Sequence, residues 1–410
     1  MARAVARVGR LRRPGVSGRE VPGVTRNARI DLLRGIAILL VLVHHLQLRM
    51  PLQDSAWFTW LPARVLYGLG SHGYEAVFLF FVISGFLIAG NALARWGTLA
   101  RIDSRDFYAR RFARIMPCLV ALLVVLSALD LLGVQYYTIV HAGQSLPRAL
   151  ASALGLHLNW YEGRTGYLPG NWDVLWSLSI EEVFYIALPL LCLLVRRERW
   201  LVALLLALAV SLPWTRAALA GNEIWQEKAY LPGMAAIATG VLAALLVARG
   251  RPPAQSSTRL LALAGAVGVA AVVFADDLLW RVLGDAELLV LTAAAACLAV
   301  AAHWAAHSRG QRDDARPWPG TAWIGSFGRL SYEIYLTHMF VVFSALRLFE
   351  ASGGDATFEP LWYAAAIALC WLLGAVVDRC LSTPCNRALR AWLSPLPARA
   401  LRAARTDPRT

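Results

Sequence analysis

One apolar stretch near the N-terminus carries residues whose types and spacing could support chemistry. The segment Ile30–Leu48 reads IDLLRGIAILLVLVHHLQL, a helix candidate that contains Asp31, Arg34, His44 and His45. Arg34 and His45 are eleven residues apart. That is about three helical turns, so the two side chains share one stripe roughly 16 Å long, whereas His44 points roughly 80° away. Ionisable groups within membrane helices usually face a bundle interior or a wet cavity. The alternative is that Arg34 extends to the interface and His45 packs against another helix.

A basic cluster lies in FYARRFARIMP (residues 107–117), where Arg110, Arg111 and Arg114 precede a long apolar run. Guanidinium groups bind phosphate through two parallel hydrogen bonds, so the cluster could hold a phosphorylated donor. It could also anchor the chain to anionic lipid at the membrane surface.

Two adjacent glutamates, Glu181 and Glu182, lie in the apolar segment WDVLWSLSIEEVFYIALP (residues 172–189). Ser177, Glu181 and Tyr185 follow one another at intervals of four residues and therefore share a helix face. Trp176, like the preceding Trp172, suits an aromatic belt at the outer interface. The structural alternative is a glutamate that pairs with an arginine and holds the bundle together.

Two further segments interrupt apolar runs with polar or small residues. His338 in GRLSYEIYLTHMF lies about ten residues into its run, which places it near mid-membrane. A lone histidine there could simply be packed. The pair Ser84-Gly85 in FFVISGFLI indicates close helix packing. Together the histidines, carboxylates and arginines predict group transfer between a phosphate-rich cytoplasmic ligand and a hydroxyl-bearing acceptor, with histidine as the general base.

These residues need a membrane bundle to position them. The chain has 410 residues, of which 58% are hydrophobic and 16% charged, and its mean hydropathy is +0.53. Soluble domains carry about a quarter charged residues, so we predict an all-α polytopic bundle. The ten predicted membrane spans are Ile30–Leu48, Tyr74–Leu93, Ile115–Val134, Val174–Val195, Trp200–Leu219, Ala229–Val247, Leu260–Ala275, Ala286–Ala306, Arg329–Leu348 and Leu361–Leu381.

Positive charge sets the expected orientation. With both termini cytoplasmic, the inner segments hold 32 of the 40 basic residues, as the positive-inside rule requires. A further apolar patch, Leu146–Trp160, would destroy this asymmetry if it spanned, so we predict a re-entrant or interfacial segment. Residues 1–29 and 385–410 are predicted basic cytoplasmic tails around a membrane domain of residues 30–384. The net charge of +14 therefore reflects topology rather than nucleic-acid binding.

The six cysteines show no CxxC spacing, so neither a disulfide framework nor a zinc site is predicted, and no metal is expected. The segment before Ile30 lacks the apolar core of a signal peptide.

Five segments in order resemble the signature blocks of the integral-membrane acyltransferase-3 family. They are DLLRGIAILLVLVHH, FFVISGFLI, FYARRFARIMP, WSLSIEEVFY and SYEIYLTH, and the resemblance runs from Asp31 to about Pro384. It implies ten core helices in the bacterial cytoplasmic membrane. It also implies transfer of an acyl group, commonly acetyl, from cytoplasmic acyl-coenzyme A. The expected acceptor is a hydroxyl of an envelope glycan, sugar or secreted small molecule.

The resemblance also implies roles for individual residues. Arg34 and His45 match the family's motif of arginine, ten residues and histidine, with His45 as catalytic base and Arg34 as its partner. Glu181 matches the glutamate of the pattern Trp-Ser-x-x-x-Glu and joins the expected catalytic residues. Arg34 and the basic cluster would bind the coenzyme A phosphates. The residues expected to bind substrate are Trp176, Ser177, Glu182, Tyr185 and His338.

The chain also departs from the family pattern. Phe78 stands where many members have an acidic residue, with Glu75 one turn away, and Ser382-Thr383-Pro384 stands where Glu-x-Pro is usual. These departures leave the acceptor open, and a homo-oligomer is also compatible with the sequence. Two rival functions remain at this point: a proton-coupled transporter or flippase of a polar or lipid-linked solute, and a non-catalytic scaffold in envelope assembly.

Overall fold

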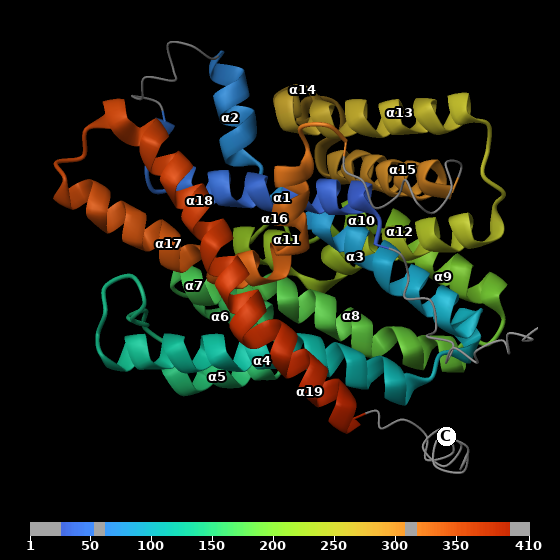
Figure 1. Ribbon diagram of the computed structural model, residues 1–410, viewed down its shortest axis with the longest axis horizontal. Coiled ribbons are helices and arrows are strands. Elements are labelled where there is room, and N and C mark those ends of the chain that lie inside the picture. Colours follow the sequence, from blue (N-terminus) through green and yellow to red (C-terminus); the bar gives the residue numbers. More distant parts are fainter. Residues whose placement is uncertain (1–25, 53–61, 308–317, 394–410) are drawn as a thin grey trace, which may run out of the picture.

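The computed structural model describes residues 26–52, 62–307 and 318–393, and within these ranges every regular element is a helix (Figure 1). The predicted all-α class is therefore confirmed for this part of the chain. The α-helices are α1 (Ala28–Gln47), α2 (Ala63–Ser71), α3 (Gly73–Trp96), α4 (Ser104–Leu131), α5 (Leu146–Leu154), α6 (Leu158–Thr165), α7 (Gly170–Asp173), α8 (Leu175–Leu194), α9 (Glu198–Val210), α10 (Leu212–Ala217), α11 (Glu223–Lys228), α12 (Tyr230–Arg249), α13 (Gln255–Phe274), α14 (Asp276–Leu283), α15 (Glu287–His307), α16 (Ala322–Arg329), α17 (Ser331–Ala351), α18 (Glu359–Val377) and α19 (Thr383–Leu393).

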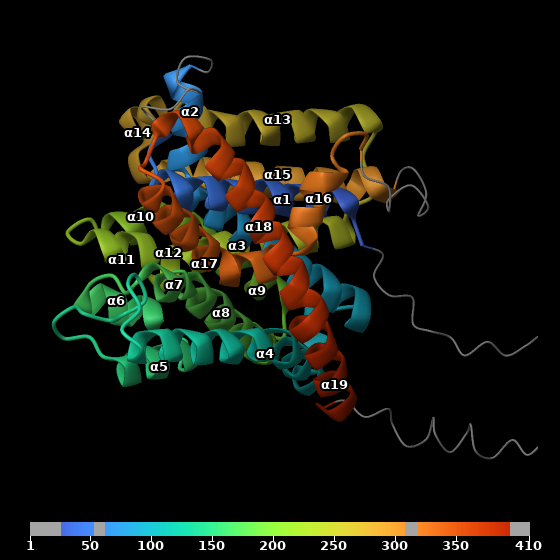
Figure 2. The same ribbon diagram turned by 60° about the vertical axis from the view of Figure 1, so that its left-hand side comes forward.

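Nine helical segments within the described ranges are long and apolar enough to cross a membrane, and they coincide with nine of the ten predicted spans. The exception is Trp200–Leu219, which forms the shorter helices α9 and α10. Pro213 lies in the first turn of α10, where a missing backbone N–H is tolerated. In the middle of one continuous helix the same residue would remove a backbone hydrogen bond, so the helix breaks before it. In Figures 1 and 2, α9 and α10 together lead from one end of the bundle toward the other. The count of ten stays a prediction.

The ends of the long helices gather at two ends of the bundle. In Figure 1 the junctions α3–α4, α8–α9 and α12–α13 lie at the right and α19 ends at the bottom, whereas the connections after α4 and α17 lie at the left. The junctions at the right carry the basic loops predicted to be cytoplasmic. The patch Leu146–Trp160 folds into α5 and most of the first turn of α6, two short helices rather than one span.

Two helix boundaries differ from the hydropathy pattern. Helix α4 begins at Ser104, eleven residues before the predicted Ile115, because Asp103 caps it by accepting from the backbone N–H groups of Arg105 and Asp106. The last span continues through a π-turn at Asp378–Ser382 into α19. The predicted C-terminal tail thus starts as helix, and residues 394–410 and 1–25 lie outside the described ranges.

Glycines let pairs of long helices touch backbone to backbone. A Cβ on Gly85 of α3 would overlap the carbonyl of Ile237 in α12, and one on Gly240 of α12 would overlap the carbonyl of Val82 in α3. Close approach of this kind replaces the missing hydrophobic drive between helices in a membrane. Helices α1 and α16 meet in the same way at Gly35 and Gly328.

Candidate active site

Helix α17 lies along the stripe of α1 that carries Arg34 and His45. Arg34 Nη2 donates to Ser331 Oγ at 2.7 Å, at the first residue of α17. Two turns further along α17, the ring of His338 lies with its centroid 5.0 Å from that of His45. Both predicted members of the motif therefore meet the same partner helix. Asp31, one turn before Arg34, forms its ion pair with Arg26, whose Nε contacts the Asp31 carboxylate at 2.7 Å.

The His45–His338 pair leaves one nitrogen of each ring available. His338 is fully buried and its Nδ1–H donates to the carbonyl of Tyr335 at 2.7 Å, so Nε2 carries the lone pair of the neutral ring. His338 Nε2 and His45 Nδ1 have no hydrogen-bond partner among the described residues. Buried polar atoms are normally satisfied, so two open nitrogens side by side are typical of a site awaiting a ligand. His45 itself is partly exposed.

His44 is distinguished from His45 by its contacts. Its Nδ1 lies 2.9 Å from the carbonyl oxygen of Gly70, and its ring centroid lies 5.3 Å from that of His45. His44 is thus hydrogen-bonded to the last turn of α2, whereas the His45 ring lies beside that of His338.

Helix α8 adds hydroxyl and aromatic groups beside the histidines. The hydroxyls of Ser177 and Tyr335 lie 2.8 Å apart, and Tyr335 donates to the carbonyl of Val174 at 3.0 Å. Trp176 is buried and stacks on Tyr74 of α3 with centroids 6.3 Å apart. Residues Trp176, Ser177 and His338 are therefore brought to one region. Tyr335 was not among the residues predicted from the sequence. Its position one helical turn before His338 was the signal that could have identified it.

The two glutamates of α8 face arginines. Tyr185 donates to Glu181 Oε1 at 2.5 Å, as expected for residues four apart on one face. Arg111 Nη2 donates to Glu182 Oε1 at 3.2 Å and its guanidinium lies 3.8 Å from the Tyr185 ring centroid. Glu182 and Arg111, assigned to substrate and donor, thus engage each other in the manner of the structural alternative. Glu181 interacts electrostatically with Arg34 and Arg111.

The basic cluster on α4 is only partly committed to acidic partners. Arg110 Nε contacts both carboxylate oxygens of Asp106 at 3.0 Å, one helical turn away. Arg114 lies 5.5 Å from the Tyr332 ring centroid and within electrostatic range of Arg34. The sequence missed Arg390 of α19, which packs against α4 and interacts with Arg110 and Arg114. Arg390 was not among the predicted site residues, because the predicted membrane domain ended at residue 384.

A buried ion cluster, also missed, holds the segment before α8 in place. Lys228 Nζ contacts Glu162 Oε2 at 3.0 Å and, more closely, Asp173 Oδ1. Burial, reinforced by the neighbouring Asp173 carboxylate, raises the pKa of Glu162 well above its usual value. The field of Lys228 reaches His45. Lys228 is the single lysine of the chain, and this was the feature of the sequence that could have pointed to the cluster.

No group of three or more histidine, cysteine or acidic side chains suited to a metal ion occurs within the described ranges. The arrangement offers imidazoles, a hydroxyl pair and arginines along one line through a bundle of long apolar helices. Those features define a polytopic membrane protein with a polar internal site, whose groups suit acid–base chemistry on an anionic ligand.

Comparison with known proteins assigns this bundle to a family. The family model described as an acyltransferase domain matches residues 27–377, and the chain belongs to this acyltransferase-3 family. The predicted resemblance is therefore confirmed.

Two relatives show how far the similarity extends. The chain is 28% identical over 402 residues to the acyltransferase MdmB of Streptomyces mycarofaciens, covering 90% of this chain and 94% of that protein. It is 27% identical over 215 residues to the peptidoglycan O-acetyltransferase OatA of Listeria monocytogenes, covering 50% of this chain and only 29% of that protein. The chain thus spans less than a third of the length of this second relative. No solved structure matches the chain.

Proposed function

We propose that this protein is a membrane-embedded O-acyltransferase that moves an acyl group, most simply acetyl, from cytoplasmic acyl-coenzyme A to a hydroxyl of a sugar, envelope glycan or secreted small molecule. The observation that carries the proposal is the His45–His338 pair, each ring with an open nitrogen, in line with Arg34 along one helix. Family membership and the O-acetyltransferase relative support the class of reaction.

The donor end of the site is the cluster of arginines. The three arginines come from three helices: Arg34 from α1, Arg114 from α4 and Arg390 from α19. Arg114 lies within electrostatic range of both Arg34 and Arg390. Coenzyme A carries phosphates, which arginine binds through charge-assisted hydrogen bonds. Arg110 and Arg111 each pair with an acidic side chain, so a donor phosphate would bind them only in competition with Asp106 and Glu182.

The transfer step uses His45 as general base. His45 removes the proton of the acceptor hydroxyl as its oxygen attacks the thioester carbonyl, the C–O bond forms, and the C–S bond breaks. The imidazolium then returns the proton to the departing thiolate, which leaves as coenzyme A. His338 and Tyr335 hold His45 and the acceptor in place, and Glu181 balances the positive charge of Arg34 and Arg111.

A pair of adjacent histidines provides the test. His45→Ala in purified, folded protein is expected to lower acyl transfer from radiolabelled acetyl-coenzyme A by about 10²–10⁴-fold, the usual contribution of a general base. The matched control is His44→Gln, next to it in the chain but directed at Gly70. This control is expected to retain transfer within a few-fold.

Two outcomes would contradict the proposal. Undiminished transfer in His45→Ala would remove His45 from the mechanism. Solute uptake or export by the wild-type protein without thioester consumption would favour the transporter function instead, since mid-membrane histidines and glutamates also suit proton coupling.

A further inference from the structure

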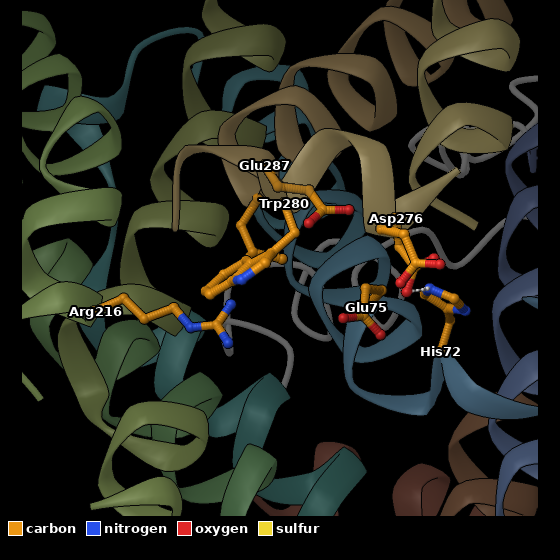
Figure 3. A pocket seen from close by; sticks show the side chains of 8 residues that line it. His72, Glu75, Arg216, Asp276, Trp280 and Glu287 are labelled. Atoms are coloured by element: carbon orange, nitrogen blue, oxygen red, sulfur yellow. Dashed lines mark ion pairs between the residues drawn. The ribbon is translucent and has the colours of Figure 1, made fainter. Parts of the chain in front are cut away.

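A charged pocket of about 270 Å³ lies apart from the histidine pair, at the beginning of α3 and α15 (Figure 3). Its lining residues are His72, Glu75, Arg216, Asp276, Asp277, Trp280, Glu287 and Leu288. The lining comes from α3, α10, α14 and α15 and from the residue that precedes α3. In Figure 2, α10 and α14 lie at the end of the bundle opposite α19. By the predicted topology this end faces outward.

One side chain of the lining lacks a partner. Glu287 is 9% exposed, and its Oε1 has no hydrogen-bond partner among the described residues. Figure 3 shows its carboxylate directed into the space between Trp280, Asp276 and Glu75. A buried acceptor of this kind normally has a protein or ligand donor, so Glu287 indicates a missing donor in the pocket.

Two other side chains of the lining lie close to an acidic partner. Arg216 Nε lies 3.3 Å from Asp285 Oδ1, and His72 Nε2 lies 3.6 Å from Asp276 Oδ2. The pocket therefore presents guanidinium donors on one side and carboxylate acceptors on the other (Figure 3). A hydroxyl both donates and accepts, whereas an ammonium group only donates. A ligand rich in hydroxyls satisfies both walls.

Trp280 adds an aromatic surface to these polar walls. The Arg216 guanidinium lies 5.9 Å from the Trp280 ring centroid and 5.2 Å from that of Tyr74. An indole with a polar rim suits a ligand that has one apolar face and polar edges. The volume is just below the roughly 300 Å³ at which small-molecule sites begin, so it suits a single ring rather than a chain of rings.

Contacts between neighbouring residues connect the pocket with the histidines. The turn that bears His72 continues into Gly73, whose Cα hydrogen faces the His44 ring so closely that a Cβ would overlap it. His44 in turn lies beside His45. On a second path, Tyr74 stacks on Trp176, the neighbour of Ser177. The pocket is therefore one layer of side chains from the proposed transfer site.

We propose that this pocket binds one neutral, hydroxyl-rich sugar ring on the outward face and is the acceptor subsite of the enzyme. The inference rests on the proposed acyltransferase function for its role in catalysis. Glu287 and Glu75 would accept hydrogen bonds from ring hydroxyls, Arg216 would donate to a ring oxygen, and Trp280 would cover the apolar face.

Binding is tested without catalysis, by calorimetry on purified full-length protein with a neutral methyl glycoside and with the matching amino sugar. Glu287→Gln, which is near-isosteric, is expected to weaken methyl glycoside binding by about tenfold or more, as for loss of a hydrogen bond to a charged group. Trp280→Ala is expected to weaken binding by a similar factor, because the apolar face of the ring loses its aromatic cover. The controls are Trp214→Ala on α10 and Glu223→Gln on α11, both exposed and outside the lining. Size-exclusion profiles establish that each variant is folded.

The possible results separate the two proposals. Three results would overturn the proposed sugar site. The protein binds no glycoside, it binds the amino sugar alone, or neither pocket variant changes glycoside binding. Pocket-dependent binding in a protein that consumes no acyl donor would leave the pocket standing and remove the acyltransferase proposal. If the protein transfers acyl groups but neither variant changes the acceptor KM, the acyltransferase proposal stands and the pocket is not the acceptor subsite. In the supported case, both variants raise the acceptor KM while slow hydrolysis of the acyl donor continues.

Discussion

At the scale of single residues, the polar atoms of this bundle are paired across helices that lie far apart in the sequence. Lys228 shows this most clearly, because its side chain is 3% exposed and its ammonium contacts carboxylates of α6 and α7. Charges removed from water in this way persist only when they are paired and hydrogen-bonded. The cluster fixes α6 and α7 against the end of α11, just before α12 begins.

We predict that Lys228→Met destabilises the protein by roughly 3–5 kcal/mol, because the buried Glu162 and the half-buried Asp173 lose the cation that they share. Denaturation in detergent micelles measures the loss. Arg249→Met provides the control: its ion pair with Glu198 joins side chains that are 54% and 41% exposed, so about 0–1 kcal/mol is expected. Equal losses in the two variants would show that burial does not govern the strength of these pairs.

The sequence could identify some of these residues and not others. Arg34 and His45 were predictable because helical periodicity places them on one stripe, and both meet α17. The partners themselves, Ser331 and His338, are about 300 residues away, beyond the reach of periodicity. Arg390 was missed because the last membrane helix was expected to end before it, whereas that helix continues into α19, which packs against α4.

At the scale of helices, hydropathy predicts where a span lies but not how it packs. The beginning of α4 was placed eleven residues late, because arginines lower the hydropathy of a segment that a cap and good helix formers keep helical. The small pair Ser84-Gly85 did predict close packing, and Gly85 lies against the backbone of α12. Which helix it would meet could not be read from the sequence, since small residues are common on many faces.

Two glycines of α3 give a matched test of this packing. Gly85→Ala is expected to destabilise the protein by about 1–3 kcal/mol, because the new methyl group overlaps the Ile237 carbonyl and forces α3 and α12 apart. Gly90→Ala lies on the same helix with no atom within 4 Å of the added Cβ. It is expected to gain about 0.5–1 kcal/mol from reduced chain entropy. Thermal unfolding in one detergent compares them, and a stabilising Gly85→Ala would refute the close contact.

At the scale of the whole molecule, the two ends of the bundle differ in chemistry. The arginine cluster and the junctions rich in basic residues lie at one end, and the charged pocket and ion cluster lie toward the other (Figures 1 and 2). The His45–His338 pair lies between them along α1 and α17. Such an arrangement suits a donor that arrives from one side and an acceptor that arrives from the other. This interpretation depends on which side of the membrane each loop is predicted to face.

The pair α9 and α10 decides that topology. Residues 198–217 are helical except at Ser211, and twenty residues at 1.5 Å each reach about 30 Å, the thickness of the hydrocarbon core. Trp200 and Trp214, 59% and 67% exposed, lie toward opposite ends, where interfacial tryptophans are favoured. We therefore expect this broken helix to cross the bilayer as the tenth span.

Membrane-impermeant maleimide labelling of single cysteines in a cysteine-free variant tests the crossing. Arg197→Cys should be labelled only in inside-out vesicles and Gly221→Cys, whose Cβ would face open space, only in right-side-out vesicles. Ala100→Cys and Ala142→Cys, at exposed positions in connections that precede α9, serve as the inner and outer references. If Arg197→Cys and Gly221→Cys label from the same side, α9 and α10 do not cross. Every loop after α10 then changes sides, so Ser352→Cys, exposed after α17, must label from the cytoplasm. The α14 and α15 residues of the pocket would then lie on the opposite side of the membrane from His72 and Glu75, which precede α9, and the sugar pocket could not form.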